Sequence, residues 1–237
     1  DYFKEVVDEG LKGSGNYGVF GVGCYNGQGG SLLEQNDNLH VIARLTIPWK
    51  FANGQRWENS IQGYTGEYVV LGSAIRPLGI GSAVRPIGTL ETGDTVGHRD
   101  ERVAVTSVWY PQPIGFQTEW NVGRSPQLNA AQTAIEVGDV RGGYAMTMLK
   151  FDTDCHGVFI PFYRYNYYEG GYKSERNAPF VNIREHEVGC EWQFNKQTEL
   201  TTMYTWTDRT NTQALADGRS YQQFVGQFLR FQLQINY

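Results

Sequence analysis

Apolar and polar residues alternate with a period of two along most of the chain. In the last run, Leu229, Phe231 and Leu233 alternate with Arg230 and Gln232. Successive side chains of a β-strand point to opposite faces, so such runs predict strands with one apolar face and one largely polar face. We expect ten or eleven strands, over residues 17–25, 39–49, 61–70, 102–110, 116–122, 143–151, 158–168, 180–187, 188–194, 199–206 and 228–237. Only residues 4–12 suggest a short helix or turn.

The connections between these runs alternate in length. Tight links are expected at residues 111–113, 152–157 and 195–197. Long polar loops are expected at residues 27–38, 72–100, 124–132, 170–179 and 208–221. Short turns at one end of the strands and long loops at the other are typical of an outer-membrane barrel, although a soluble β-sandwich is compatible with the same alternation.

Composition narrows the class of protein. The 237 residues carry a formal net charge of −5, only 19% are charged, 14% are aromatic and 29 are glycine. The hydrophobic and aromatic content argues against disorder, and the absence of a cationic run argues against a nucleic-acid partner. No stretch approaches the roughly 18 consecutive apolar residues of a membrane helix. Cys24, Cys155 and Cys190 show no CxxC spacing, so they predict neither a disulfide framework nor a zinc site.

Two features favour a membrane barrel over a sandwich. Tryptophans lie near the ends of the strand runs, as at Trp49, Trp109 and Trp192, and tryptophan prefers the membrane–water boundary. The final run alternates up to the terminal aromatic residue Tyr237, which is similar to the assembly signal of bacterial outer-membrane proteins. We therefore predict an all-β fold, a transmembrane antiparallel up-and-down β-barrel.

Several segments of the chain form a characteristic series. The most distinctive is Ile160-Pro161-Phe162-Tyr163-Arg164-Tyr165, followed by Tyr168-Glu169-Gly170-Gly171 and Lys173. The others are residues 18–27, 41–49, 117–120, 142–144 and 226–237. In this order, these segments resemble the phosphate-selective porins O and P of Gram-negative outer membranes, and the similarity extends over the whole sequence.

The resemblance implies a 16-stranded, homotrimeric channel in the bacterial outer membrane that passes small anions such as phosphate. At about ten residues per strand plus connections, 237 residues fall several strands short of such a barrel. We therefore expect residues 1–237 to be a single porin β-barrel domain, the carboxy-terminal portion of a longer barrel. The expected partners are small anionic solutes, outer-membrane lipid and, through the terminal strand, the barrel-assembly machinery.

Selectivity in such a channel comes from charged side chains on the lumen face, and arginine offers paired donors that match phosphate or carboxylate. We expect six arginines to line the pore, with the first three the best placed within strands: Arg44, Arg164, Arg230, Arg184, Arg124 and Arg102. The alternative is that they pair with carboxylates such as Glu119 and Glu187 and only keep the wall wetted. The net charge of −5 gives anion passage no independent support.

No motif points to catalysis, a metal or a cofactor. Asp152-Thr153-Asp154 lacks the remaining oxygen ligands of a calcium loop, and Glu185-His186-Glu187 lacks the second histidine of a zinc-protease helix. We expect a protein that is not an enzyme and needs no cofactor. The alternative function is a soluble β-sandwich that binds carbohydrate through exposed aromatics such as Trp57, Tyr64 and Trp206.

Overall fold

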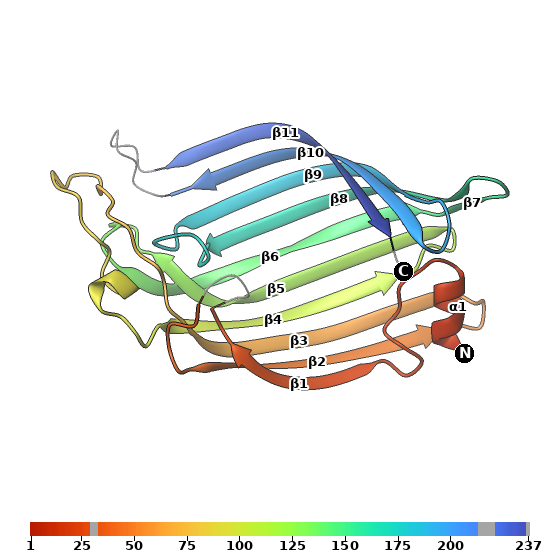
Figure 1. Cartoon of the computed structure of the whole chain (residues 1–237), viewed down its shortest axis with the longest axis horizontal. Coiled ribbons are helices and arrows are strands. Elements are labelled where there is room, and N and C mark those ends of the chain that lie inside the picture. The colour runs from red at the N-terminus through yellow and green to blue at the C-terminus, as the bar shows by residue number, and fades with distance from the viewer. Residues whose placement is uncertain (29–32, 213–220, 236–237) are drawn as a thin grey trace.

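The structure, a computed structural model, describes residues 1–28, 33–212 and 221–235. It contains one short α-helix, one 3-10 turn and eleven strands (Figure 1). The helices are α1 (Tyr2–Asp8) and η1 (Leu90–Thr92). The strands are β1 (Val19–Asn26), β2 (Leu39–Lys50), β3 (Arg56–Tyr68), β4 (His98–Trp109), β5 (Ile114–Leu128), β6 (Ile135–Leu149), β7 (Phe151–Thr153), β8 (Gly157–Gly171), β9 (Phe180–Gln193), β10 (Thr198–Asn211) and β11 (Gln222–Ile235). Among the described residues, no helix combines the length and apolar character that crossing a bilayer requires.

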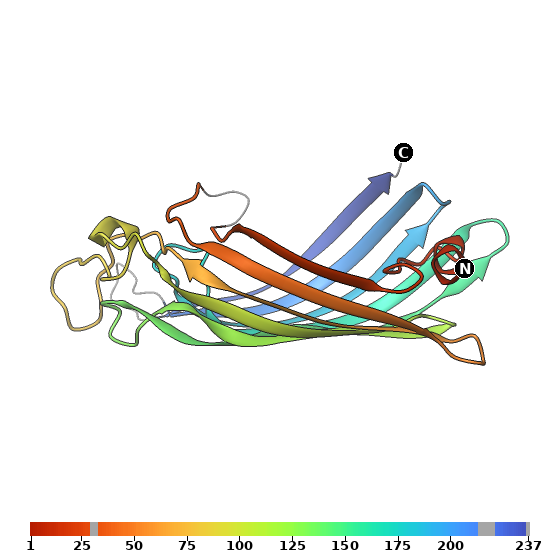
Figure 2. The ribbon, with the colours of Figure 1, turned by 90° about the horizontal axis from the view of Figure 1, so that it is seen from below.

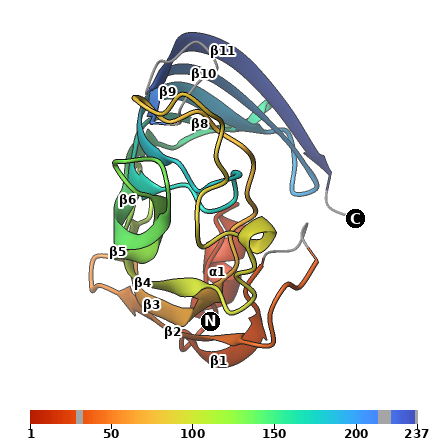
Figure 3. The same ribbon diagram turned by 90° about the vertical axis from the view of Figure 1, so that its left-hand side faces the viewer.

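All strands form one antiparallel sheet in which each long strand pairs with the next along the chain. The short β7 pairs with β8 beside this path. Seen along the strands, the sheet is C-shaped, with β1 and β11 at the two ends of the C (Figure 3). Within the described residues these two edge strands do not pair with each other. The predicted up-and-down antiparallel architecture is confirmed, and the single sheet rules out the two-sheet sandwich.

The two faces of the curved sheet differ as the alternation predicts. The register joins Val41, Thr65 and Glu101 in one row and Ile42, Tyr64 and Arg102 in the next, so each row lies wholly on one face. The convex face carries the exposed apolar side chains, which include Val41, Leu45, Ile47, Ile61, Val103, Val105, Trp120, Val122, Val188, Leu229, Phe231, Leu233 and Ile235. In a membrane barrel this is the face that meets lipid.

Aromatic rings gather on the convex face at the end with the tight turns. Trp57 lies 5.4 Å from Trp49 and 6.3 Å from Trp109, measured between ring centroids. The Trp57 indole N–H also donates to Ser107 Oγ at 2.8 Å. Rings with an apolar body and one satisfied polar atom suit the boundary between lipid and water. Two of the predicted strand-end aromatics, Trp49 and Trp109, thus cluster with Trp57 at one rim, whereas Trp192 contacts Phe159 and Phe194.

Three differences between the observed and the predicted elements have a clear structural reason or consequence. The runs 180–187 and 188–194 are one strand, β9, because the ladder to β10 continues across them from Val181 to Gln193. β5 and β6 stay paired from Arg124–Asp139 to Leu128–Ile135, so the predicted loop over residues 124–132 is mostly strand. At this end both faces are polar or covered by loops, and hydrophobic alternation therefore disappears while backbone pairing continues. The helix covers Tyr2–Asp8 and ends earlier than the expected 4–12 segment.

Residues 1–16 fold into the hollow of the sheet at the tight-turn end (Figure 2). Val6 and Leu11 are buried against Tyr110, with Tyr2 and Val108 packed around them. The Tyr110 hydroxyl donates to the Lys12 carbonyl at 2.8 Å, and Gln193 on β9 donates to the Gly10 carbonyl at 2.8 Å. The segment therefore bridges strands from the two arms of the C.

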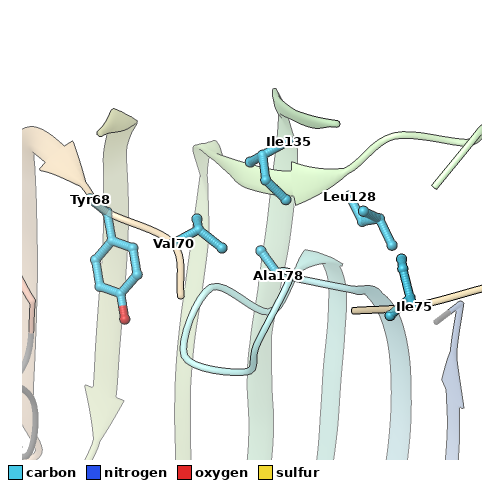
Figure 4. Packing of buried hydrophobic residues seen from close by; sticks show 6 residues of the cluster. All are labelled: Tyr68, Val70, Ile75, Leu128, Ile135 and Ala178. Atoms are coloured by element: carbon cyan, nitrogen blue, oxygen red, sulfur yellow. The ribbon is translucent and has the colours of Figure 1, made fainter. Parts of the chain in front are cut away.

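At the opposite end, residues 69–97 fold over the hollow and pack on the other long loops (Figure 3). Six buried side chains form the core of this loop cluster (Figure 4): Tyr68, Val70, Ile75, Leu128, Ile135 and Ala178. Asn177 is fully buried and accepts a hydrogen bond from the Ser73 amide at 2.8 Å, which ties the β3–β4 loop to the β8–β9 loop. Both ends of the hollow are thus partly covered.

Candidate functional site: the concave face of the sheet

The concave face is rich in ionisable side chains, because alternate positions of β2 to β11 point into the hollow. Its strand carboxylates are Glu58, Asp100, Glu119, Glu185, Glu187, Glu191 and Glu199, and its strand cations are Lys50, Arg56, Arg102, Arg164, Arg209, Arg44 and Arg230. The two sets are equal in number. Any charge preference of this face therefore depends on which groups are neutralised by partners.

Each of these carboxylates has a donor nearby. Glu58 accepts from the Tyr2 hydroxyl and the Ser14 amide, and Glu119 accepts from Thr106 Oγ1 at 2.9 Å. The others accept as follows: Asp100 from Tyr64 and Lys173, Glu185 from Thr207, Glu187 from Arg164 and Thr205, Glu191 from Gln193, and Glu199 from Lys12. Cations therefore compensate Asp100, Glu187 and Glu199. Glu58, Glu119, Glu185 and Glu191 accept from neutral donors and keep their negative charge.

The cations are not all paired. Lys50 and Arg56 bind Glu5, Arg56 also binds Glu9, and Arg209 binds Glu175. By contrast, Arg44 donates its Nε only to Thr46 Oγ1, at 3.1 Å. Within residues 1–28, 33–212 and 221–235, neither Arg44 nor Arg230 has a carboxylate partner. Both guanidinium groups are exposed in the hollow.

The six arginines expected to line the pore divide between the two faces. Arg44, Arg102, Arg164 and Arg230 lie on the concave face. Arg124 and Arg184 lie on the convex face, where the register places them beside Glu101 and Asp208. The sequence missed this because polar residues near the loop end occur on both faces, so polarity alone does not assign a face there. Tyr237, the expected assembly signal, lies outside the described residues.

Arg164 on β8 is held in the hollow by a buried carboxylate. Its Nε donates to Glu187 Oε2, and Glu187 is 4% exposed and also accepts from Thr205. Its Nη2 lies 3.8 Å from the Met203 sulfur, and the guanidinium lies 6.0 Å from the centre of the Tyr144 ring. The alternative interpretation, that lumen arginines pair with carboxylates, describes Arg164 but not Arg44 or Arg230.

A second cluster at the loop end was not predicted. Asp100 on β4 is fully buried and accepts from Lys173, which reaches it from the β8–β9 loop. The Lys173 ammonium lies 4.7 Å from the Tyr68 ring centre and 5.4 Å from that of Tyr64. Burial lowers the pKa of Lys173, and the Asp100 carboxylate opposes part of that shift. Asp100 and Lys173 are 73 positions apart in sequence, so no local pattern signals their contact.

The aromatic side chains of the alternative carbohydrate-binding function do not share a surface. Trp57 and Trp206 lie on the convex face, while Tyr64 lies on the concave face beside Asp100. No common platform for a sugar ring exists among them.

Comparison with known proteins agrees with this geometry. The family model described as phosphate-selective porin O and P matches residues 1–237, the whole chain. Searches of curated proteins and of solved structures returned no significant match. Members of the matching family are outer-membrane channels built as β-barrels, which is the architecture that the alternating strands and the exposed apolar convex face support. The chain belongs to the phosphate-selective porin O and P family.

Proposed function

We propose that this chain forms a water-filled, anion-selective channel for the passive diffusion of small anions such as phosphate across the bacterial outer membrane. One observation carries the proposal: within the described part of the chain, the guanidinium groups of Arg44 and Arg230 are exposed in the hollow and have no carboxylate partner. Both are therefore open to contact with a passing anion, although the whole chain carries −5.

The physics of ion channels supports this assignment. Charged side chains on a channel wall select ions by sign, and arginine presents fixed donors that match the oxygens of phosphate or carboxylate. An exposed guanidinium remains charged at any physiological pH and is weakly hydrated, so an anion exchanges on and off it readily. No chemical step is needed for diffusion, and we propose no catalytic role for any residue.

The proposal extends to the surroundings of the barrel. We propose that the convex face contacts outer-membrane lipid, that the protein is a homotrimer, and that the terminal strand engages the barrel-assembly machinery. The exposed apolar side chains on β2 to β5 and on β11 support contact with lipid. The trimer rests on the family to which the chain belongs.

Reversal potentials test the selectivity. The protein is reconstituted in a planar bilayer under a potassium chloride gradient, and we expect a reversal potential of the sign for anion preference. Arg44→Gln and Arg230→Gln each reduce the anion-to-cation permeability ratio, and the double variant reduces it further. Arg124→Gln, on the convex face, is the matched control and leaves the ratio unchanged. Cation preference in the unmodified channel would contradict the proposal.

A further inference from the structure

The hollow contains an apolar region that a channel for inorganic phosphate does not need. A cavity of about 430 Å³ lies between residues 10–12 and the concave strands. Its apolar lining comes from Leu11, Val108, Met146, Met148, Ile160, Phe162 and Met203. All three methionines of the chain are in this set. Its cationic lining comes from Lys12, Arg164 and Arg230.

The register arranges part of this lining as a line across the sheet. Met148 pairs with Phe162, Phe162 with Gly189, Gly189 with Met203, and Met203 with Arg230. A Cβ at Gly189 would approach the Phe162 ring to 2.5 Å, so that ring lies across the glycine and continues the apolar surface from β8 towards β10. We call Met148, Phe162, Gly189 and Met203 the apolar row. It ends at Arg230, which has no carboxylate partner among the described residues.

The cations around the cavity are unequal. Lys12 is bound to Glu199 at 3.2 Å and Arg164 is bound to Glu187, so both are largely neutralised. Glu191 is the carboxylate in the lining, and it accepts from Gln193 at 2.7 Å. That amide donor is neutral, so Glu191 keeps its negative charge, two strands away from Arg230. Among the described residues, Arg230 is the cation of the lining without a carboxylate partner, and it lies at one end of an apolar surface. This arrangement matches a ligand with one negative charge and a hydrocarbon body.

We propose that the cavity binds a short amphipathic monoanion, a carboxylate with an alkyl or aryl body. The carboxylate bonds to Arg230, and the hydrocarbon lies along the apolar row, where it removes apolar surface from lumen water. Methionine side chains are flexible and polarisable, so they adapt to bodies of different shape. The cavity volume falls within the range of about 300–1,000 Å³ that is usual for small-molecule sites. This inference rests on the proposed channel, because it names a solute class for the same hollow.

Binding of a homologous series of carboxylates tests the site without relying on conduction. Detergent-extracted full chain is titrated calorimetrically with acetate, butyrate and hexanoate, and protein-free micelles provide the blank. We expect the dissociation constant to fall by about fourfold for each fully buried methylene, which is the equivalent of about 0.8 kcal/mol. Hexanol, which lacks the charge, binds at least tenfold more weakly than hexanoate, since a hydrogen bond to a charged group contributes about 1.5–3 kcal/mol.

Two variants separate the apolar and the charged parts of the site. The variant Met203→Gln, beside Arg230 in the apolar row, keeps side-chain size and removes most of the dependence of affinity on chain length, while Ile42→Gln, outside the cavity on β2, keeps that dependence. Arg230→Gln weakens hexanoate about tenfold or more and leaves hexanol unchanged. A difference in migration on a denaturing gel between the unheated and the boiled sample confirms that each variant is folded.

The outcomes are distinct from those of the selectivity experiment. Equal affinity for acetate and hexanoate, or for hexanol and hexanoate, overturns the amphipathic site even when the reversal potential shows anion preference. Conversely, an affinity that rises with the chain length of the carboxylate supports the amphipathic site. If the reversal potential shows cation preference at the same time, the proposed anion selectivity is contradicted. An effect of Ile42→Gln equal to that of the methionine variant would also overturn the site, since it would show general insertion of hydrocarbon.

Discussion

At the scale of single residues, what distinguishes the arginines of the hollow is their partners. Arg164 is held by Glu187 on the neighbouring strand, whereas Arg230 on β11 has no carboxylate partner within the described residues. A paired guanidinium orients its neighbours and contributes little net field, while an unpaired one attracts mobile anions. Arg164 therefore helps to hold the wall, and Arg230 is a guanidinium that we propose to contact solute.

Removal of the Arg164 guanidinium is expected to destabilise the protein. In Arg164→Gln, the buried Glu187 carboxylate loses its charged partner, so we expect the free energy of unfolding to fall by about 2 kcal/mol. Urea titration in detergent micelles, followed by tryptophan fluorescence, measures this. The double variant Arg164→Gln/Glu187→Gln should regain part of the loss, because no unpaired buried charge remains. A double variant less stable than the single one would show that the pair is not the cause.

At the scale of the strands, the two faces of one strand have different solvents. Ile61 and Gln62 are neighbours on β3, yet Ile61 lies on the exposed apolar convex face and Gln62 on the concave face beside Arg44. This contrast follows from the strand period of two, because successive side chains point to opposite faces of the sheet.

A pair of adjacent substitutions tests that assignment. Ile61→Arg places a charge against lipid near the middle of a strand, so we expect a loss of about 2–4 kcal/mol in folding into phospholipid bilayers. Gln62→Arg places the same side chain in the lumen and is expected to cost less than 1 kcal/mol. Reversible urea unfolding from liposomes measures both. Equal costs at the two positions would contradict the assignment of the faces.

Charged contacts that depend on pH help to attach the N-terminal helix to the sheet. Hydrogen bonds from Lys50 and then Arg56 hold the pKa of Glu5 at about 2, below its usual 4.5. Because the pKa is lowered in the folded state, the contribution of Glu5 is fully present above pH 4.5 and is lost as the pH falls through about 2. Hydrogen bonds from Lys4 and then Lys196 also lower the pKa of Asp8, so the contribution of Asp8 is likewise lost in acid.

We therefore expect α1 to loosen in acid. Hydrogen exchange of residues 2–8, corrected for intrinsic rates, should accelerate as the pH is lowered from 4.5 towards 2. In Glu5→Gln the exchange at pH 7 should already be faster, and its remaining acceleration in acid should be smaller. Protection of α1 that is unchanged over this range would show that packing of Val6 and Leu11 alone holds the segment.

At the scale of the whole molecule, a curved sheet with an apolar outside has its hollow partly covered at both ends. Residues 1–16 bridge the tight-turn end, and residues 69–97 pack on the other long loops at the opposite end (Figures 2 and 3). The cavity with Arg164 and Arg230 lies between the N-terminal segment and the strands. A solute crossing the hollow therefore passes charged and apolar surfaces in succession.

The proposed assembly predicts a specific behaviour in detergent. Membrane barrels keep their strands paired because each backbone group in lipid is satisfied within the sheet. Without heating, the protein should migrate as a folded species at the size of a trimer on a denaturing gel, and after boiling at 26.8 kDa. Identical migration before and after heating would contradict a stable barrel, and an unheated species at the size of one chain would contradict the trimer alone.

The alternating pattern by itself determined the class of fold and most of the strands. Period-two runs such as Leu229, Phe231 and Leu233 placed the apolar face correctly, because strand geometry fixes which residues share a face. The same rule correctly placed Arg44, Arg164 and Arg230 on the opposite face. It failed for Arg124 and Arg184, since the ends of the strands are polar on both faces and carry no alternation there.

Only the tertiary structure decided which charges are neutralised and what covers the hollow. Lys173 meets Asp100, Lys12 meets Glu199 and Met148 aligns with Met203 through contacts between segments far apart in sequence. Such contacts depend on sheet curvature and on the paths of loops, which no local periodicity encodes. The sequence therefore determined a barrel wall with an apolar and a charged face. The three-dimensional arrangement decided that, among the residues the structure describes, Arg44 and Arg230 lack a carboxylate partner, because pairing is a property of neighbours in space.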